Sequence, residues 1–86
     1  MIKMAEQISE ISIMINRLNE IQEDLTVPRN VRARIEDIVN TLREDAELSI
    51  KVNRVLNDLD EIANDTNLQS YTRAQIWNVV SVLEKL

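Results

Sequence analysis

The chain has 86 residues and a net charge of −5, and it contains no glycine, no cysteine, no histidine and a single proline. The absence of cysteine and glycine excludes disulfide scaffolds, cysteine-ligated zinc and glycine-rich phosphate loops. Without histidine, the chain also lacks the commonest catalytic base and the commonest transition-metal ligand.

The first predicted element is a helix over residues 2–23, because apolar residues recur there at the helical period of 100° per residue. Its stripe consists of Met4, Ile8, Ile11, Met14, Ile15, Leu18, Ile21 and Leu25. The next segment contains Pro28, which suits the first turn of a second helix because that turn leaves its N–H groups unpaired. Thr26 or Val27 is then expected at the N-cap, and the Thr26 hydroxyl is the better cap.

Three further helices are predicted from the same spacing. Their stripes are Val31, Ile35, Ile38, Val39 and Leu42 in the second, Leu48, Val52, Val55, Leu56, Leu59 and Ile62 in the third, and Ile76, Val79, Val80, Leu83 and Leu86 in the fourth. Turn-forming residues at 64–67 separate the last two helices, and Ser70 is the expected N-cap of the fourth. A chain with few aromatic residues and no glycine suits helices better than strands.

The two halves of the chain align without a gap at an offset of 41 residues. Identical pairs at this offset include Leu18/Leu59, Glu20/Glu61, Ile21/Ile62, Asp24/Asp65, Arg32/Arg73, Ala33/Ala74, Ile35/Ile76, Val39/Val80 and Leu42/Leu83. A helical hairpin repeated at this length resembles a HEAT-like unit. Two such units are too few for a solenoid, so we expect them to close into a four-helix array.

Asp24 and Asp65 occupy equivalent turns, and Arg32 and Arg73 lie one turn into the helices that follow. One interpretation is a paired anion site or an acid/base pair. The structural interpretation is that each Asp accepts hydrogen bonds from N–H groups of its turn while each Arg contacts a neighbouring helix end. Because catalysis rarely needs two copies, the duplication favours a structural turn formed by these residues and Pro28.

No metal, cofactor or catalytic group is expected. Helix-bundle di-iron sites need Glu-x-x-His, and the chain has no histidine. The segment from Asp65 resembles the start of a calcium loop, but it lacks the glycine at the sixth position and has Ile76 where the bidentate Glu belongs. No serine or threonine has a histidine to activate it, so we expect no enzyme activity and no small-molecule ligand.

Nucleic acid and membrane are not expected partners. Arg29, Arg32 and Arg34 form the one local basic concentration, but no aromatic residue is interleaved with them and the net charge repels phosphate. The longest apolar run, Ile13–Ile15, is far shorter than the roughly 20 residues that span a bilayer.

Five apolar residues lie away from the predicted core stripes and are candidates for a protein interface: Ile13, Ile50, Tyr71, Trp77 and Val82. At the offset of 41, Trp77 corresponds to Glu36. If the halves fold alike, the first therefore exposes a polar residue where the second has an aromatic one. The alternative is that Trp77 closes the bundle as a core residue, since large aromatic side chains are favoured both in cores and at interface hot spots.

The segment Val27-Pro28-Arg29-Asn30-Val31-Arg32 and the tail from Arg73 to Leu86, with its Ile-Trp-Asn sequence, resemble a small archaeal family, uncharacterised protein family 0147. The resemblance covers nearly the whole chain. It implies a short, acidic, all-helical protein, and it implies no activity and no functional residues.

We therefore expect one all-α domain over residues 1–86, an antiparallel four-helix bundle made of hairpins at about 2–44 and 46–86. The expected function is contact with a protein partner or with a second copy as a homodimer, in the cytoplasm. Two alternatives stay open: a nucleic-acid-associated accessory protein that uses the three arginines named above, and a small enzyme without a recognisable motif.

Overall fold

The structure, a computed structural model, describes the backbone of residues 4–86 and the side chains of residues 10–86. Four helices account for most of this part of the chain, and none of its residues lies in a strand. The helices are α1 (Met4–Glu23), α2 (Arg29–Arg43), α3 (Leu48–Ala63) and α4 (Ser70–Leu83). The prediction of an all-helical protein with four helices is confirmed, and the predicted start of the first helix at residue 2 lies outside the described residues.

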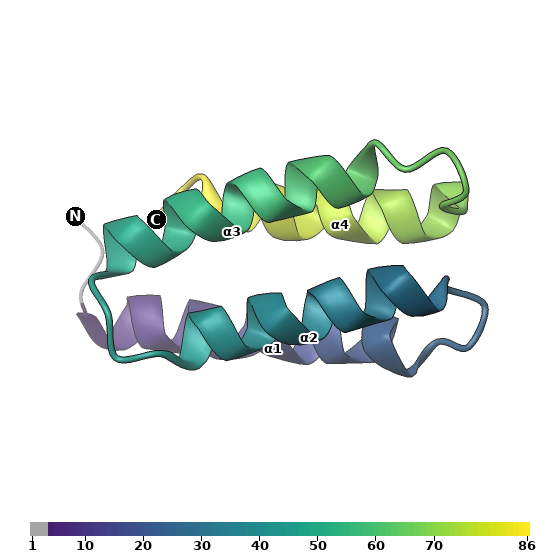
Figure 1. Ribbon diagram of the computed structural model, residues 1–86. Helices are drawn as coiled ribbons and strands as arrows, with labels where there is room; N and C mark the ends of the chain where they lie inside the picture. Colours follow the sequence, from purple (N-terminus) through teal and green to yellow (C-terminus); the bar gives the residue numbers. More distant parts are fainter. Residues whose placement is uncertain (1–3) are drawn as a thin grey trace.

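Consecutive helices run in opposite directions and form an elongated bundle of 37 × 20 × 19 Å. The hairpin of α1 and α2 lies against the hairpin of α3 and α4 (Figure 1). Helix α1 packs against α2 and α4, and α3 packs against the same two helices. The turns 24–28 and 64–69 lie at one end of the bundle, and the connection 44–47 lies at the other.

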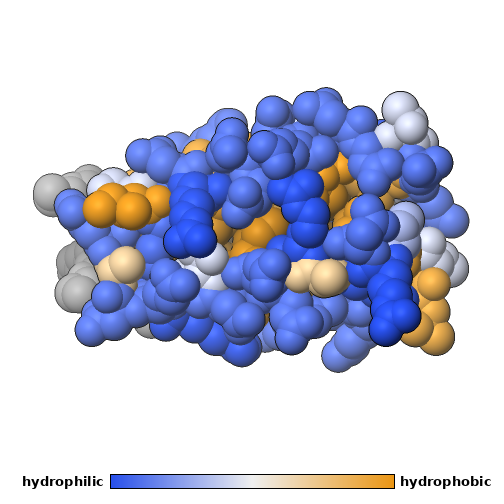
Figure 2. Space-filling view, in the orientation of Figure 1, coloured by the Kyte–Doolittle hydropathy of each residue, from blue (hydrophilic) through white to orange (hydrophobic). Residues whose placement is uncertain are grey.

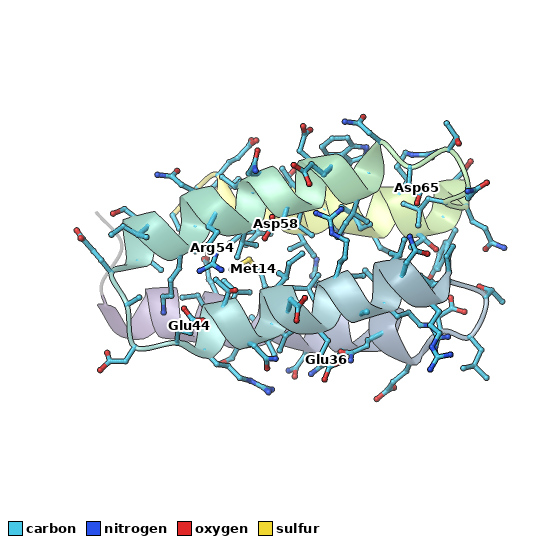
Figure 3. The ribbon with its side chains drawn as sticks, viewed as in Figure 1. Met14, Glu36, Glu44, Arg54, Asp58 and Asp65 are labelled. Atoms are coloured by element: carbon cyan, nitrogen blue, oxygen red, sulfur yellow. The ribbon has the colours of Figure 1, made fainter. Side chains whose placement is uncertain are left out.

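The core lies along the axis of the bundle, where the predicted stripes meet. Met14 lies between the two hairpins (Figure 3), and Leu18, Ile35, Leu59 and Ile76 are fully buried around it. Burying each such side chain stabilises the fold by about 1.5–3 kcal/mol. The predicted stripes are buried or half-buried throughout the described residues, with one exception that concerns the end of α1.

That exception is Leu25, which is 83% exposed although its spacing assigned it to the first stripe. The helix ends at Glu23, so the helical register no longer applies two residues later. Met4 and Ile8 of the same stripe lie outside the residues whose side chains are described.

Both predicted N-caps are wrong. The cap position of α2 is Pro28 itself, with φ −54° and ψ 142°, and its carbonyl accepts the N–H of Arg32 at 3.0 Å. The Thr26 hydroxyl donates instead to the Asp24 carboxylate, at 2.7 Å. In α4 the cap position is Gln69, so Ser70 is already the first helical residue, and neither helix has a side-chain cap hydrogen bond.

The two hairpin turns contain matching hydrogen bonds. In each turn the carboxylate Oδ1 of the aspartate accepts the backbone N–H two residues later, at 2.9 Å from Thr26 to Asp24 and at 2.9 Å from Asn67 to Asp65. The carbonyl of each aspartate also accepts the N–H three residues later, at 3.1 Å from Val27 and at 3.2 Å from Leu68. The same local geometry is therefore built at positions 41 residues apart.

The two arginines that follow these turns donate to backbone carbonyls. The Nε of Arg32 donates to the carbonyl of Val27 at 3.2 Å. Arg73 makes three such bonds, from Nε to Ala63 at 2.9 Å and from Nη2 to Asp65 at 2.9 Å and to Leu68 at 3.3 Å. Because the last carbonyls of a helix have no partner within the helix, Arg73 caps the end of α3.

Candidate protein-binding groove

A hollow of about 520 Å³ lies between α3 and the end of α4. One side consists of Leu48, Val52 and Leu56, which share a row of α3 because they are spaced four residues apart. The other side is formed by Leu83 and Leu86. The polar residues of its lining are Glu47, Ser49, Asn53 and Glu84.

Three leucines of this hollow keep apolar surface in contact with solvent. Leu48, Leu56 and Leu86 are half-buried, and they pack against the core without being covered by it. The surface is left open because α4 ends at Leu83, beside the first turns of α3. None of these residues was singled out from the sequence as a candidate site, since each also belongs to a core stripe.

Trp77 lies on the same flank of α4 as this hollow. It precedes Val80 by three residues and Glu84 by seven, so the three share one row of the helix. Glu84 lines the hollow, and Trp77 lies about 10 Å farther along the axis at 1.5 Å per residue. The indole is 41% exposed. We call the surface formed by Leu48, Val52, Leu56, Trp77, Leu83 and Leu86 the α3–α4 groove.

Ile13 and Val82 lie at a different junction, between α1 and α4. A hollow of about 170 Å³ there is lined by Arg17 and Glu20 of α1 and by Gln75 and Asn78 of α4. Ile13 lies one turn before Arg17, and Val82 lies one turn after Asn78. Because the two helices are antiparallel, Ile13 and Val82 therefore face each other across this junction. Ile13 is 50% exposed and Val82 is half-buried.

Of the remaining two candidates, only Ile50 stands apart from both junctions. Ile50 is 60% exposed and lies nine residues before the buried Leu59, which places it about 180° around α3 from the core. Tyr71 is 69% exposed and lies in the first turn of α4, four residues before Gln75, so it is on the flank of α4 that faces α1 and about 120° around the helix from Trp77. The five residues proposed from the sequence therefore do not form one patch.

The junction of α2 and α3 is polar. Figure 2 shows hydrophilic side chains over most of the face that these two helices form, with apolar side chains visible between the helices and at the ends. Arg54 and Asp58 of α3 and Glu44, which directly follows α2, lie at this junction (Figure 3) and line a hollow of about 350 Å³. Arg34 pairs with Glu61 beside them, with 2.7 Å between Nη2 and Oε2.

Most of the side-chain hydrogen bonds close turns or helix ends. Nζ of Lys51 donates to the carbonyls of Leu42 at 3.3 Å and of Glu44 at 3.0 Å, so this lysine caps the end of α2, a role the sequence did not suggest. Of the three clustered arginines, Arg32 donates to its own turn and Arg34 pairs with a carboxylate. The guanidinium groups of Arg32 and Arg34 are therefore directed to partners within the chain.

The pKa of Asp24 is lowered from its ordinary value of 3.8. The main causes are the hydrogen bonds that its carboxylate accepts from the hydroxyl and the backbone N–H of Thr26, because they favour the charged form. The charge of Arg32 acts in the same direction. This carboxylate therefore holds the turn and remains ionised at neutral pH.

Within the described part of the chain, no group of three or more acidic, histidine or cysteine side chains is arranged to hold a metal ion. Every buried side-chain polar atom there has a hydrogen-bond partner. The helices described are also too short or too polar for any of them to cross a membrane.

The model of uncharacterised protein family UPF0147 matches residues 1–86. The chain belongs to this family. A solved structure with the same fold is the crystal structure of the unknown-function protein MMP1188, which is 37% identical to this chain. The two structures superpose with a TM-score of 0.86 over 100% of this chain and 96% of that one. No curated protein matches the chain.

Proposed function

We propose that this UPF0147 protein is a protein-binding module, acting in the cytoplasm, whose contact surface is the α3–α4 groove. The observation that carries the proposal is the occurrence of two apolar features on one flank of α4, the hollow of about 520 Å³ and the exposed indole of Trp77. Exposed apolar side chains that are gathered on one surface, rather than scattered singly, are typical of sites that bind another protein.

The residue types of the groove fit a protein partner. Tryptophan is the side chain most enriched at interface hot spots, and the half-buried Leu48, Leu56 and Leu86 supply apolar surface around it. The polar rim of Ser49 and Asn53 offers hydrogen bonds at the edge of the contact. A catalytic role has less support because, among the described residues, the hydroxyl of Ser49 has no hydrogen bond to the carboxylate of Glu47 or Glu84 that could activate it.

We propose further that the two hairpins are copies of one HEAT-like unit. Support comes from the matching hydrogen bonds of the two turns and from burial at positions 41 residues apart. The buried residues Val31, Ile35, Ile38, Val39 and Leu42 of α2 correspond to the buried Thr72, Ile76, Val79, Val80 and Leu83 of α4.

A homodimer through the junction of α1 and α4 is the second candidate. The observation in its favour is that Ile13 and Val82 face each other there, while the corresponding positions of the α2–α3 junction hold Arg54 and Thr41. Light scattering over a hundredfold concentration range tests it. Concentration-dependent doubling of the mass, abolished by Ile13→Arg, would support the dimer, and a constant monomer mass would exclude it.

The groove itself is tested by photo-crosslinking in cells. A photoreactive amino acid replaces Asn53, which lines the groove, and in a matched control it replaces Ser12, which is exposed at the corresponding position of α1. We expect a discrete protein adduct from position 53 and none from position 12. Equal adducts from both positions, or none from position 53, would contradict the proposal.

A further inference from the structure

We propose that the segment bound in the α3–α4 groove is a basic amphipathic helix of about three turns. This inference rests on the proposed function, and it names the chemistry of the partner. It depends on the shape of the groove and on the charges along it. It also depends on a comparison with the equivalent surface of the first hairpin.

The groove has the shape that receives a helix. Two antiparallel helices form its walls, and the rows of side chains along them leave a channel into which the ridge of a third helix can pack. From Trp77 to Leu86 the groove extends for about 14 Å at 1.5 Å per residue, which matches nine or ten residues of a bound helix. Such a helix presents apolar side chains at positions i, i+3 or i+4, and i+7.

The charges along the groove are negative. Glu47 and Glu84 line the hollow and are exposed, and the exposed Asp60 lies one turn after Leu56 on the row that continues toward the end of α3. No basic side chain lines the hollow in the part of the chain whose side chains are described. A partner helix with Lys or Arg beside its apolar stripe would therefore meet opposite charges at both ends of the contact.

The neighbouring cations are directed elsewhere. Arg73, one turn before Trp77, donates to the carbonyls that end α3 and the turn beyond it. Lys51 donates to the carbonyls at the end of α2. Lys85 follows Glu84 and lies about 100° farther around, away from the groove. Among the residues whose side chains are described, none therefore places a cation beside the carboxylates of the rim inside the groove.

The first hairpin differs from the second at the position of the indole and at one position of the acidic rim. Glu36 stands where the second hairpin has Trp77, and Arg43 stands where it has Glu84. Both Glu36 and Arg43 are exposed. The combination of an exposed indole with an acidic rim is therefore particular to the second hairpin, although both hairpins share one backbone frame.

The test uses two synthetic peptides of twelve residues that carry the same leucine stripe. One has lysines beside the stripe, the other has glutamates, and neither contains tryptophan. Because Trp77 is the only tryptophan of the chain, its fluorescence reports directly on occupancy of the groove. We expect the lysine peptide to shift the emission to shorter wavelength and to bind about tenfold more tightly than the glutamate peptide, with a difference that shrinks as salt is added.

Two charge-reversal variants separate the groove from the net charge. Glu47→Lys with Glu84→Lys should reverse the preference between the peptides. Glu23→Lys with Glu36→Lys makes the same change of net charge on the first hairpin and should leave the preference intact. Equal binding of the two peptides, no binding of either, or reversal by both variant pairs would overturn the inference. If an adduct still forms from position 53 in that case, the groove remains a protein-binding site and only the class of partner is wrong.

Discussion

The two hairpins share a frame and differ in the surface they present. Both turns are closed by an aspartate that accepts the N–H two residues later, and both second helices bury the same five positions. The exposed positions diverge, with Glu36 and Arg43 in the first hairpin against Trp77 and Glu84 in the second. The comparison teaches that the buried rows and the turn aspartates determine the fold, while the outer face of each hairpin can change independently.

The largest expected effect concerns the shared core. Leu18→Ala and Leu59→Ala each remove a fully buried side chain at corresponding positions. Each should lower the free energy of unfolding by about 2–5 kcal/mol, because the deletion loses apolar burial and leaves a cavity. Urea denaturation measures both, with Leu25→Ala as an exposed control expected to change stability by less than about 0.5 kcal/mol. A small effect in only one hairpin would contradict the common frame.

The next effect distinguishes the two turns. Arg73→Met should lower the free energy of unfolding by about 1–3 kcal/mol, because three carbonyls lose their donor while the apolar stem is kept. Arg32→Met removes a single bond, so about 1 kcal/mol or less is expected. The same denaturation experiment measures both variants. Equal losses would show that the extra bonds of Arg73 contribute nothing to stability.

A smaller effect concerns the two junctions between the hairpins. The exposed pair of Arg34 and Glu61 in one junction corresponds to Gln75 and Glu20 in the other. Glu61→Gln should therefore cost about 0–1 kcal/mol of stability, and Gln75→Arg should add a similar amount at low salt. Both changes should vanish in high salt because exposed charges are screened. A loss of stability from Gln75→Arg would show that the junctions are not equivalent.

The smallest effect concerns the Asp24 turn. Because the pKa of Asp24 is lowered in the folded state, this carboxylate stabilises the fold above its ordinary pKa of 3.8. That contribution is lost as the pH falls through the lowered pKa. Thr26→Val removes the hydroxyl donor and should raise the pKa of Asp24, which NMR titration of the carboxyl carbon measures. An unchanged pKa would mean that the backbone N–H of Thr26 and Arg32 account for the whole shift.

The four helices could be predicted from the sequence because the apolar period is strong in every element. The N-caps could not, since Asp24 competes for the Thr26 hydroxyl and Pro28 itself takes the cap position. The five interface residues predicted from the sequence do not form one patch, for a related reason. Spacing along one helix tells which residues share a row, but it does not tell which row of the next helix faces it.

The α3–α4 groove was missed because its leucines belong to a core stripe. Leu48, Leu56 and Leu86 are half-buried. For Leu48 and Leu86 this depends on where α3 begins and α4 ends relative to each other. The groove could have been indicated by the positions of Leu48, at the start of α3, and Leu86, just beyond the end of α4. An apolar residue at the end of a helix is surrounded by fewer side chains than one in its middle. Trp77 was found because it lies away from the core stripe of Ile76, Val79, Val80 and Leu83.

The central claim is that the second hairpin binds a protein through the α3–α4 groove while the shared frame only supports it. The most direct measurement is the yield of the adduct from position 53 in wild type and in Trp77→Glu, which introduces the residue of the first hairpin, with a thermal melt of each protein. The account predicts a cooperative melt in both and loss of the adduct in the variant. An unfolded variant would show that Trp77 belongs to the core, and an undiminished adduct would show that the partner does not contact the indole; either result would contradict the account.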